Sequence, residues 1–320
     1  MKKLTLLLCF VSFLTKAQNI TVASGKSFTI EKTGAVTMSG NFSNAGTFTL
    51  NSDSNEFSSI IIGGTVTGNI SYNRYVNSVG TNEWDLIGSP VDGLSISAFA
   101  SANVSTLATN GATKAIGYYN NADNTWTNYT TSTIGGAGNF PLGKGFQMAT
   151  IANGTGILSF TGSPAATNKT QAIINNDAAN SGAGTRWNLV ANPFPSYIQG
   201  NTNADSSNNF LTINSDKLDD SYEAIYGYDA DGSGYTVYNN TSAALNLAPG
   251  QAFMIASDNT STDNISFTTD MRTMAGGDDL ILGRIMQDSY GLILSIYKGD
   301  TEIDQTKFYF KEGLTLGLDP

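Results

Sequence analysis

The run Trp84-Asp85-Leu86-Ile87-Gly88-Ser89-Pro90 returns 103 residues later as Trp187-Asn188-Leu189-Val190-Ala191-Asn192-Pro193. In both copies a polar residue follows the tryptophan and a proline closes the run. The similarity continues in order: Ile116-Gly117-Tyr118 corresponds to Tyr226-Gly227-Tyr228, Trp126 and Tyr129 to Tyr235 and Tyr238, Leu142–Phe146 to Pro249–Phe253, and Leu158–Phe160 to Ile265–Phe267. Two related units therefore follow one plan, which favours a scaffold over a single catalytic pocket.

The duplicated units are predicted to be β-sandwich-like modules at residues 77–165 and 183–272. Each tryptophan is expected to be buried against the sheet of its own module and to anchor a turn closed by the proline. The structural anchors of the repeat are then Trp84, Pro90, Trp187, Pro193, Phe146 and Phe253. Residues 166–182, rich in Ala, Asn, Thr and Gly, are expected to be a linker or loop. Single helical turns are expected near 96–100 and 209–211.

Residues 18–76 show apolar pairs two apart that recur every 8 to 12 residues, punctuated by glycine. Period two predicts strands, and such short strands fit the stacked rungs of a β-solenoid better than long hairpins, with a small sandwich as the alternative. The pairs are Ile20/Val22, Phe28/Ile30, Val36/Met38 and Phe48/Leu50.

The last segment, residues 273–320, resumes strand patterning. Leu292–Ile296 and Thr306–Phe310 are the expected strands, and Gly299-Asp300 marks the turn between them. Because the chain stops at Pro320 where a new sheet has just begun, we expect this segment to be incomplete. The predicted fold class is all-β: a short β-solenoid-like region, two related β-sandwich-like modules and the start of a further β-sheet.

The first 17 residues predict export. Lys2 and Lys3 precede an apolar stretch from Leu4 to Leu14, and Ala17 provides a small residue for cleavage, so residues 1–17 are expected to be a signal peptide. The apolar stretch is too short to span a bilayer stably. A lipoprotein signal ending at Cys9 is the disfavoured alternative, because it would leave too short an apolar region. The protein is therefore expected to be secreted, extracellular or on the outer cell surface.

Composition excludes several chemistries. Cleavage removes three of the 16 basic residues and none of the 26 acidic ones, which leaves a net charge near -13 and disfavours nucleic acid as a partner. The chain has no histidine, and its one cysteine, Cys9, lies in the signal peptide. Disulfides, Ser-His-Asp or cysteine nucleophiles and the usual zinc ligands are thus excluded from the exported chain. Carboxylate chemistry remains: paired acids for glycoside hydrolysis, or oxygen ligands for calcium.

Four aromatic residues are the candidates for ligand binding. Trp126, Tyr129, Tyr235 and Tyr238 follow polar loops in both modules, and exposed aromatic rings there would stack on sugars. Packing within the core or across strands is the alternative for all four.

A calcium loop is suggested by Asp229, Asp231 and Ser233, whose spacing matches the first, third and fifth ligands of an EF-hand. The twelfth place is Asn240 instead of glutamate, and no helices flank the loop, so a hairpin turn is the favoured interpretation. The acidic groups Asp216/Asp219/Asp220/Glu223 and Asp278/Asp279 are interpreted as solvated surface. The glycines around Lys144 lack a phosphate-loop fingerprint and are interpreted as a turn, and no cofactor is predicted.

Several of these stretches together resemble large surface proteins of Bacteroidetes. They are Trp187–Ser196, Pro249–Phe253, the strand ending at Phe267 with Arg272 beyond it, and Phe308–Gly313. In that group such modules precede a C-terminal signal for the type IX secretion system, and many members are adhesin-like. The resemblance covers residues 69–320 and implies no catalytic residues. It is looser in the first module, and the sorting domain expected after the last strands is absent from this chain.

These observations predict a non-catalytic, adhesin-like surface protein that binds a glycan or another surface polymer. Two weak, similar sites on one chain would act together through avidity. The alternatives are a carboxylate-dependent polysaccharide-degrading enzyme or accessory module, and a purely structural spacer.

Overall fold

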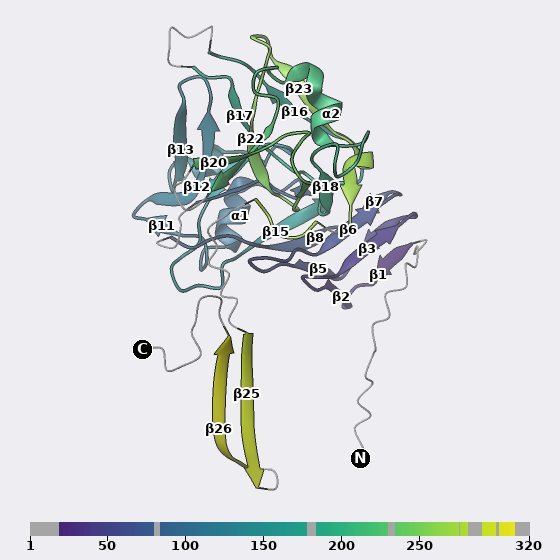
Figure 1. Cartoon of the computed structure of the whole chain (residues 1–320), viewed down its shortest axis with the longest axis vertical. Coiled ribbons are helices and arrows are strands. Elements are labelled where there is room, and N and C mark those ends of the chain that lie inside the picture. Colours follow the sequence, from purple (N-terminus) through teal and green to yellow (C-terminus); the bar gives the residue numbers. More distant parts are fainter. Residues whose placement is uncertain are drawn as a thin grey trace. The chain divides into compact units, whose positions relative to one another are not determined.

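The computed structural model describes residues 19–79, 84–177, 184–229, 234–274, 276–280, 290–298 and 301–310, the last two ranges as backbone only. The chain forms two compact units, residues 1–283 and 284–320. Strands dominate the described residues, which contain two short α-helices, so the fold is all-β as predicted (Figure 1). Neither of these helices has the length or the apolar character needed to cross a membrane.

The first strands stack as a parallel β-solenoid. Ile20 pairs with Phe42 and Phe42 with Val66, while Leu50 pairs in parallel with both Ile30 and Tyr72. The three sheets are β1-β4-β7, β2-β5-β8 and β3-β6. The strands are β1 (Ile20–Val22), β2 (Ser27–Ile30), β3 (Ala35–Met38), β4 (Phe42–Asn44), β5 (Thr47–Asn51), β6 (Ser59–Ile62), β7 (Val66–Thr67) and β8 (Ile70–Tyr75). The predicted solenoid is confirmed by this pairing.

Apolar and polar side chains alternate along the solenoid strands, and this alternation explains how the rungs stack. Phe48 and Leu50 point inward and are buried, and Phe42 meets Phe48 edge to face at 5.0 Å between ring centroids. Along one edge of the stack Asn73 donates to Asn51 and Asn51 to Glu31, so polar side chains pair between rungs as the strands do. Inward apolar and outward polar residues thus repeat from rung to rung.

The first module and the solenoid share strand β8, which pairs in parallel with β5 and antiparallel with β15. Its main sheet has the order β9-β14-β12-β13, with β11 also on β12, and its second layer is β8-β15-β10. One apolar core runs through solenoid and module across residue 76. The elements are β9 (Asp85–Ile87), β10 (Val91–Asp92), α1 (Ile96–Ala102), β11 (Thr109–Asn110), β12 (Thr113–Asn120), β13 (Thr125–Thr130), η1 (Ile134–Gly136), β14 (Phe146–Met148) and β15 (Ile157–Pro164).

The second module repeats this plan. Its main sheet, β17-β22-β19-β20, has the same order as β9-β14-β12-β13, and β23 takes the place of β15. Residues 169–173 lie in the stretch expected to be a linker, but they form β16, which pairs with β23 and buries Ile173. The elements are β16 (Lys169–Ile173), β17 (Trp187–Ala191), β18 (Tyr197–Gln199), α2 (Phe210–Asn214), η2 (Ser215–Lys217), β19 (Ile225–Asp229), β20 (Gly234–Tyr238), β21 (Asn246–Leu247), β22 (Ala252–Ala256), β23 (Asp263–Phe267), η3 (Thr269–Met271) and β24 (Arg272–Thr273).

A buried asparagine at the end of each short helix fixes that helix to the sheet. Asn103 donates to the carbonyl of Ser159 at 3.0 Å and accepts from its N–H at 2.8 Å. Asn214 makes the same two contacts with Ser266, at 3.0 and 2.7 Å. Both asparagines also donate to the carbonyl of the phenylalanine four residues earlier in the helix. The duplication therefore extends to individual hydrogen bonds that no shared sequence run revealed.

The two modules meet through reciprocal contacts. Ile87 forms an antiparallel bridge with Gln251, and Val190, the counterpart of Ile87, forms one with Lys144, the counterpart of Gln251. The N–H of Gly88 donates to Gly250, and the N–H of Ala191 donates to Gly143, both at 2.8 Å. Each surface thus contacts its own equivalent, as in a two-fold symmetric dimer.

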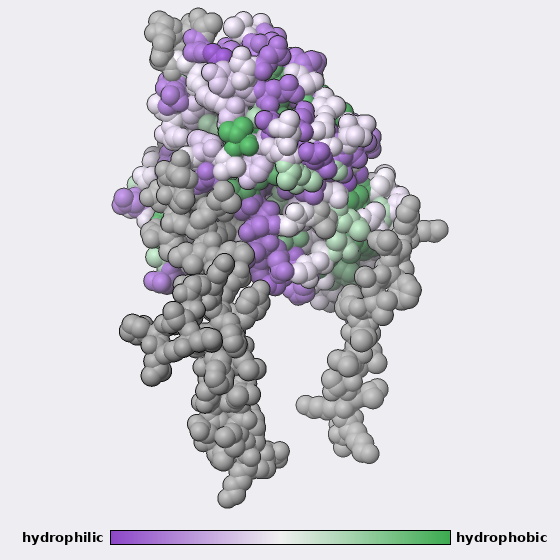
Figure 2. All heavy atoms as spheres, in the orientation of Figure 1, coloured by the Kyte–Doolittle hydropathy of each residue, from purple (hydrophilic) through white to green (hydrophobic). Residues whose placement is uncertain are grey.

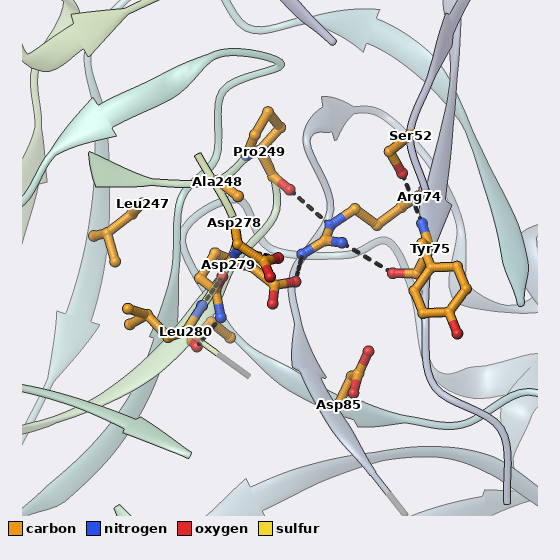
Figure 3. A network of polar contacts seen from close by, with 12 residues as sticks. Ser52, Arg74, Tyr75, Asp85, Leu247, Ala248, Pro249, Asp278, Asp279 and Leu280 are labelled. Atoms are coloured by element: carbon orange, nitrogen blue, oxygen red, sulfur yellow. Dashed lines mark hydrogen bonds and ion pairs between the residues drawn. The ribbon is translucent and has the colours of Figure 1, made fainter. Parts of the chain in front are cut away.

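A buried arginine connects the solenoid to the second module (Figure 3). Arg74 on β8 donates to the carbonyls of Pro249 and Tyr75 at 3.0 and 2.9 Å, and to the Asp279 carboxylate at 2.6 Å. Both side chains of this ion pair are fully buried, and the guanidinium lies 4.1 Å from the centre of the Phe57 ring. Asp279 was expected at the solvated surface, and this expectation was wrong because the carboxylate balances a buried cation.

The second unit contains a hairpin of β25 (Tyr290–Lys298) and β26 (Thr301–Phe310). The strands pair antiparallel from Tyr290↔Phe310 to Lys298↔Thr301. The two strands expected from the sequence are confirmed as parts of longer ones. The predicted turn at Gly299-Asp300, like the predicted signal peptide at residues 1–17, lies outside the described residues.

Candidate functional site

A pocket of about 400 Å³ lies between the two modules, and aromatic side chains dominate its lining. Tyr119, Asn124 and Trp126 come from the first module, and Trp187, Tyr226, Tyr235 and Met254 from the second. Two of the predicted ligand-binding residues, Trp126 and Tyr235, therefore line one pocket. The sequence predicted two separate sites, whereas the fold joins the two candidates into one.

Cross-strand pairing places the rings at the pocket. Trp126 on β13 lies directly opposite Tyr119 on β12, with ring centroids 5.2 Å apart, and Tyr235 on β20 lies opposite Tyr228 on β19, at 5.5 Å. Trp126 and Tyr235 are thus counterparts, as the repeat predicted. The partner of Trp126 is Tyr119, whereas the sequence alignment made Tyr118 the counterpart of Tyr228. In the strand pairing, that alignment of β12 with β19 is therefore off by one residue.

The other two candidates, Tyr129 and Tyr238, do not line the pocket. Tyr129 packs against the core of the first module and lies 5.6 Å from the Tyr118 ring, and Tyr238 packs against the core of the second. Residues three apart in a strand point to opposite faces, so an outward Trp126 requires an inward Tyr129. The same alternation separates Tyr235 from Tyr238.

Trp187 and Tyr226 were not predicted as site residues, yet both line the pocket. Trp187 was expected to be buried within its own module, but it is only half-buried and meets Tyr226 edge to face at 4.6 Å. Its counterpart Trp84, also expected to be buried, is likewise only partly buried and packs against Ala108, Ala115 and Ala149. The other anchors, Pro90, Pro193, Phe146 and Phe253, are buried as expected.

The two halves of the pocket are therefore unequal. The strand registers place Gly117 where the second module has Tyr226, and Gln147 where it has Met254. Gln147 donates to Asn128 at 2.6 Å, and a side chain at Gly117 would collide with the same asparagine. Tyr226 and Met254 thus line the pocket without equivalent side chains from the first module, so the duplication produces a single site.

Electrostatically the described lining is neutral: it contains tyrosine, tryptophan, asparagine and methionine but no charged side chain. The Tyr119 hydroxyl donates to Asn124 Oδ1 at 2.8 Å, which leaves the amide nitrogen of Asn124 as a donor. Lost hydration raises the pKa of Tyr235 to about 12, and burial also raises the pKa of Tyr119 and Tyr226. All three phenols are therefore protonated near neutral pH. The pocket offers ring faces and neutral hydrogen-bonding groups.

The suggested calcium residues are only partly described. Asp229 is buried and accepts from the Thr236 hydroxyl at 3.0 Å, while Asp231 and Ser233 lie outside the described residues. In the part of the chain that the structure describes, no cluster of three acidic residues is arranged to hold a metal ion. In the acidic group Asp216/Asp219/Asp220/Glu223, the expectation of solvated surface is wrong for Asp219, which is mostly buried because it forms an ion pair with Arg186.

On the face in Figure 2, most described residues are hydrophilic or neutral, and hydrophobic residues are scattered. The large apolar side chains that are well exposed include Trp126, at 37%, and Tyr222 and Tyr235, each at 42%. Three of the most exposed aromatic rings are thus in or beside the pocket.

Comparison with known protein families gives a match over most of the chain. A family described as a domain of unknown function, DUF8693, matches residues 10–282, which is most of the chain. No curated protein and no solved structure is similar enough to the chain to match.

Proposed function

We propose that this chain, which belongs to the DUF8693 family of domains of unknown function, is an exported, non-catalytic surface protein that binds a glycan or another surface polymer in the pocket between its modules. One observation carries the proposal. Five aromatic side chains from two modules converge on one neutral pocket, with two of them well exposed. Aromatic rings that stay accessible in a folded protein offer apolar faces for stacking, and the phenols and amide offer hydrogen bonds.

The location outside the cell rests on the predicted signal peptide and on the resemblance to Bacteroidetes surface proteins that carry a type IX sorting signal. Binding without catalysis is proposed because the described lining has no pair of carboxylates, which glycoside hydrolysis needs. Because Tyr226 and Met254 line the pocket without equivalents from the first module, we expect one ligand per chain.

The test is binding of the chain from Gln18 to Pro320 to a glycan array, followed by calorimetry with the glycan that binds best. Trp126→Ala and Tyr235→Ala should each weaken binding about tenfold or more, since each removes a stacking surface. Phe28→Ala is the matched control, because Phe28 is 40% exposed on β2 and does not line the pocket. Retained binding in both pocket variants, or a stoichiometry of two, would contradict the proposal.

A further inference from the structure

We propose that the ligand is an uncharged glycan chain longer than the pocket, and that it leaves the pocket across Tyr222, which forms an outer subsite. This inference rests on the proposed function and specifies its ligand. Two observations support it. The rings of Tyr226, Trp187 and Tyr222 form an aromatic path that continues past the pocket lining, and the charges beside this path favour a neutral ligand.

Trp187 is the point where the path leaves the pocket. Its ring lies 4.6 Å from Tyr226 inside the pocket and 5.7 Å from Tyr222, which is not part of the lining. Tyr222 is 42% exposed although it contacts Trp187, so a large part of its surface remains open to solvent. A sugar ring on Tyr222 would therefore continue the stacking surface from Tyr226 and Trp187.

Tyr222 is also held in place by contacts with Arg186 and Asp219. The Arg186 guanidinium lies 5.1 Å from the centre of the Tyr222 ring, and the Tyr222 N–H donates to the Asp219 carbonyl at 2.8 Å. Arg186 is in turn fixed by ion pairs with Asp177 and Asp219. A ring that is already oriented loses less conformational entropy when a ligand stacks on it.

The charges around the path favour a neutral ligand. The described pocket lining is uncharged, and beside Tyr222 two carboxylates surround the single guanidinium of Arg186. The whole chain carries a formal charge of -10. A glycan with carboxylate or sulfate groups would meet repulsion along this path, whereas neutral sugars would not.

The length of the ligand follows from the size of the pocket. At about 400 Å³ the pocket lies near the lower end of the range for small-ligand sites, so it holds only a few sugar rings. Tyr222 lies outside it, and only a ligand that extends beyond the pocket reaches both surfaces. A long chain should therefore bind more tightly than a short one of the same composition.

The experiment is calorimetry of the chain from Gln18 to Pro320 with neutral glucan, mannan, xylan and galactan oligomers of two and six rings, and with a polyuronate hexamer. We expect one neutral series to bind, with the hexamer about tenfold tighter than the dimer. Tyr222→Ala should abolish this difference and leave the affinity for the dimer unchanged, whereas Tyr222→Phe, which keeps the ring, should preserve it. Unchanged thermal melting of both variants will show that they fold.

Each negative result of this experiment contradicts a different part of the proposal. If the dimer and hexamer of the best series bind equally and Tyr222→Ala changes nothing, the outer subsite is wrong while pocket binding stands. If the polyuronate binds as tightly as the neutral hexamer, the assignment of an uncharged ligand is wrong. If no oligomer binds, and Trp126→Ala has no effect in any assay, the proposed function fails as well.

Discussion

Gly88 and Ala191 occupy the same position in the two modules and face each other where the modules meet. A Cβ atom on Gly88 would lie 2.3 Å from the Cβ of Ala191 and 2.8 Å from the Lys144 carbonyl oxygen. The neighbouring backbone is fixed by the paired hydrogen bonds of Gly88 with Gly250 and of Ala191 with Gly143. Two side chains with a Cβ do not fit at this contact, so one of the two positions has to be glycine.

Gly88→Ala should destabilise the protein by about 1–3 kcal/mol, because the added methyl group forces the modules apart in a packed interface. Urea unfolding measures this loss. Gly135→Ala is the control, since a Cβ there meets nothing within 4 Å and its φ is not positive. An equal, small effect of both substitutions would show that the modules do not depend on close packing at Gly88.

Asp279→Asn should cost about 3–5 kcal/mol of unfolding free energy, because it leaves the buried guanidinium of Arg74 without its carboxylate. Asp216→Asn breaks an ion pair whose aspartate is 74% exposed, so it should change stability by less than about 1 kcal/mol. Thermal or urea unfolding of both variants gives the comparison. Similar losses would mean that the Arg74 pair is solvated in the folded protein.

Asn103→Ala and Asn214→Ala should destabilise the protein by similar amounts, about 1–3 kcal/mol each. Each substitution removes the same hydrogen bonds and leaves a backbone N–H, of Ser159 or Ser266, without that acceptor. The measurement is chemical unfolding of the two single variants. A large loss in one and none in the other would show that the modules, although alike in geometry, contribute unequally to stability.

Stability should fall at high pH, partly through Tyr197. Burial raises the pKa of Tyr197 to about 12, and its hydroxyl donates to the Gly277 carbonyl. Because the folded pKa is above the unfolded value of about 10, this contribution is complete below pH 10 and is lost as the pH rises towards 12. Tyr197→Phe has no such proton to lose, so its unfolding free energy should decline less steeply across that window. An unchanged slope would contradict this assignment.

Much of the architecture was predictable from residue spacing. Apolar pairs such as Phe48/Leu50 indicated stacked strands, the doubled tryptophan run indicated two modules, and single helical turns were expected where α1 and α2 form. Each of these signals is local, because alternation and turn residues act over a few neighbours. The stretch at 166–182 was misjudged because β16 is a strand only through its pairing with β23.

The site was predictable only in part. Trp126, Tyr129, Tyr235 and Tyr238 were all chosen because they follow polar loops in both modules. Strand alternation, which places residues three apart on opposite faces, would have separated Trp126 and Tyr235 from the other two, but it was not applied. Trp187 was passed over because its sequence surroundings match those of Trp84, which packs on alanines. The two tryptophans differ in the residue across the sheet: Trp187 contacts Tyr226, whereas the first module has Gly117 at the position of Tyr226. No local sequence pattern contains this information.

The sequence by itself determined that the chain is all-β and duplicated, because strand period and repeated runs are properties of neighbouring residues. Tertiary structure alone decided that the two copies build one pocket, that the second module contributes more of its lining, and that Asp279 is buried against Arg74. The reason is that these features depend on which surfaces meet. Residues such as Gly88 and Ala191 acquire their meaning from contacts between segments that are distant in the chain.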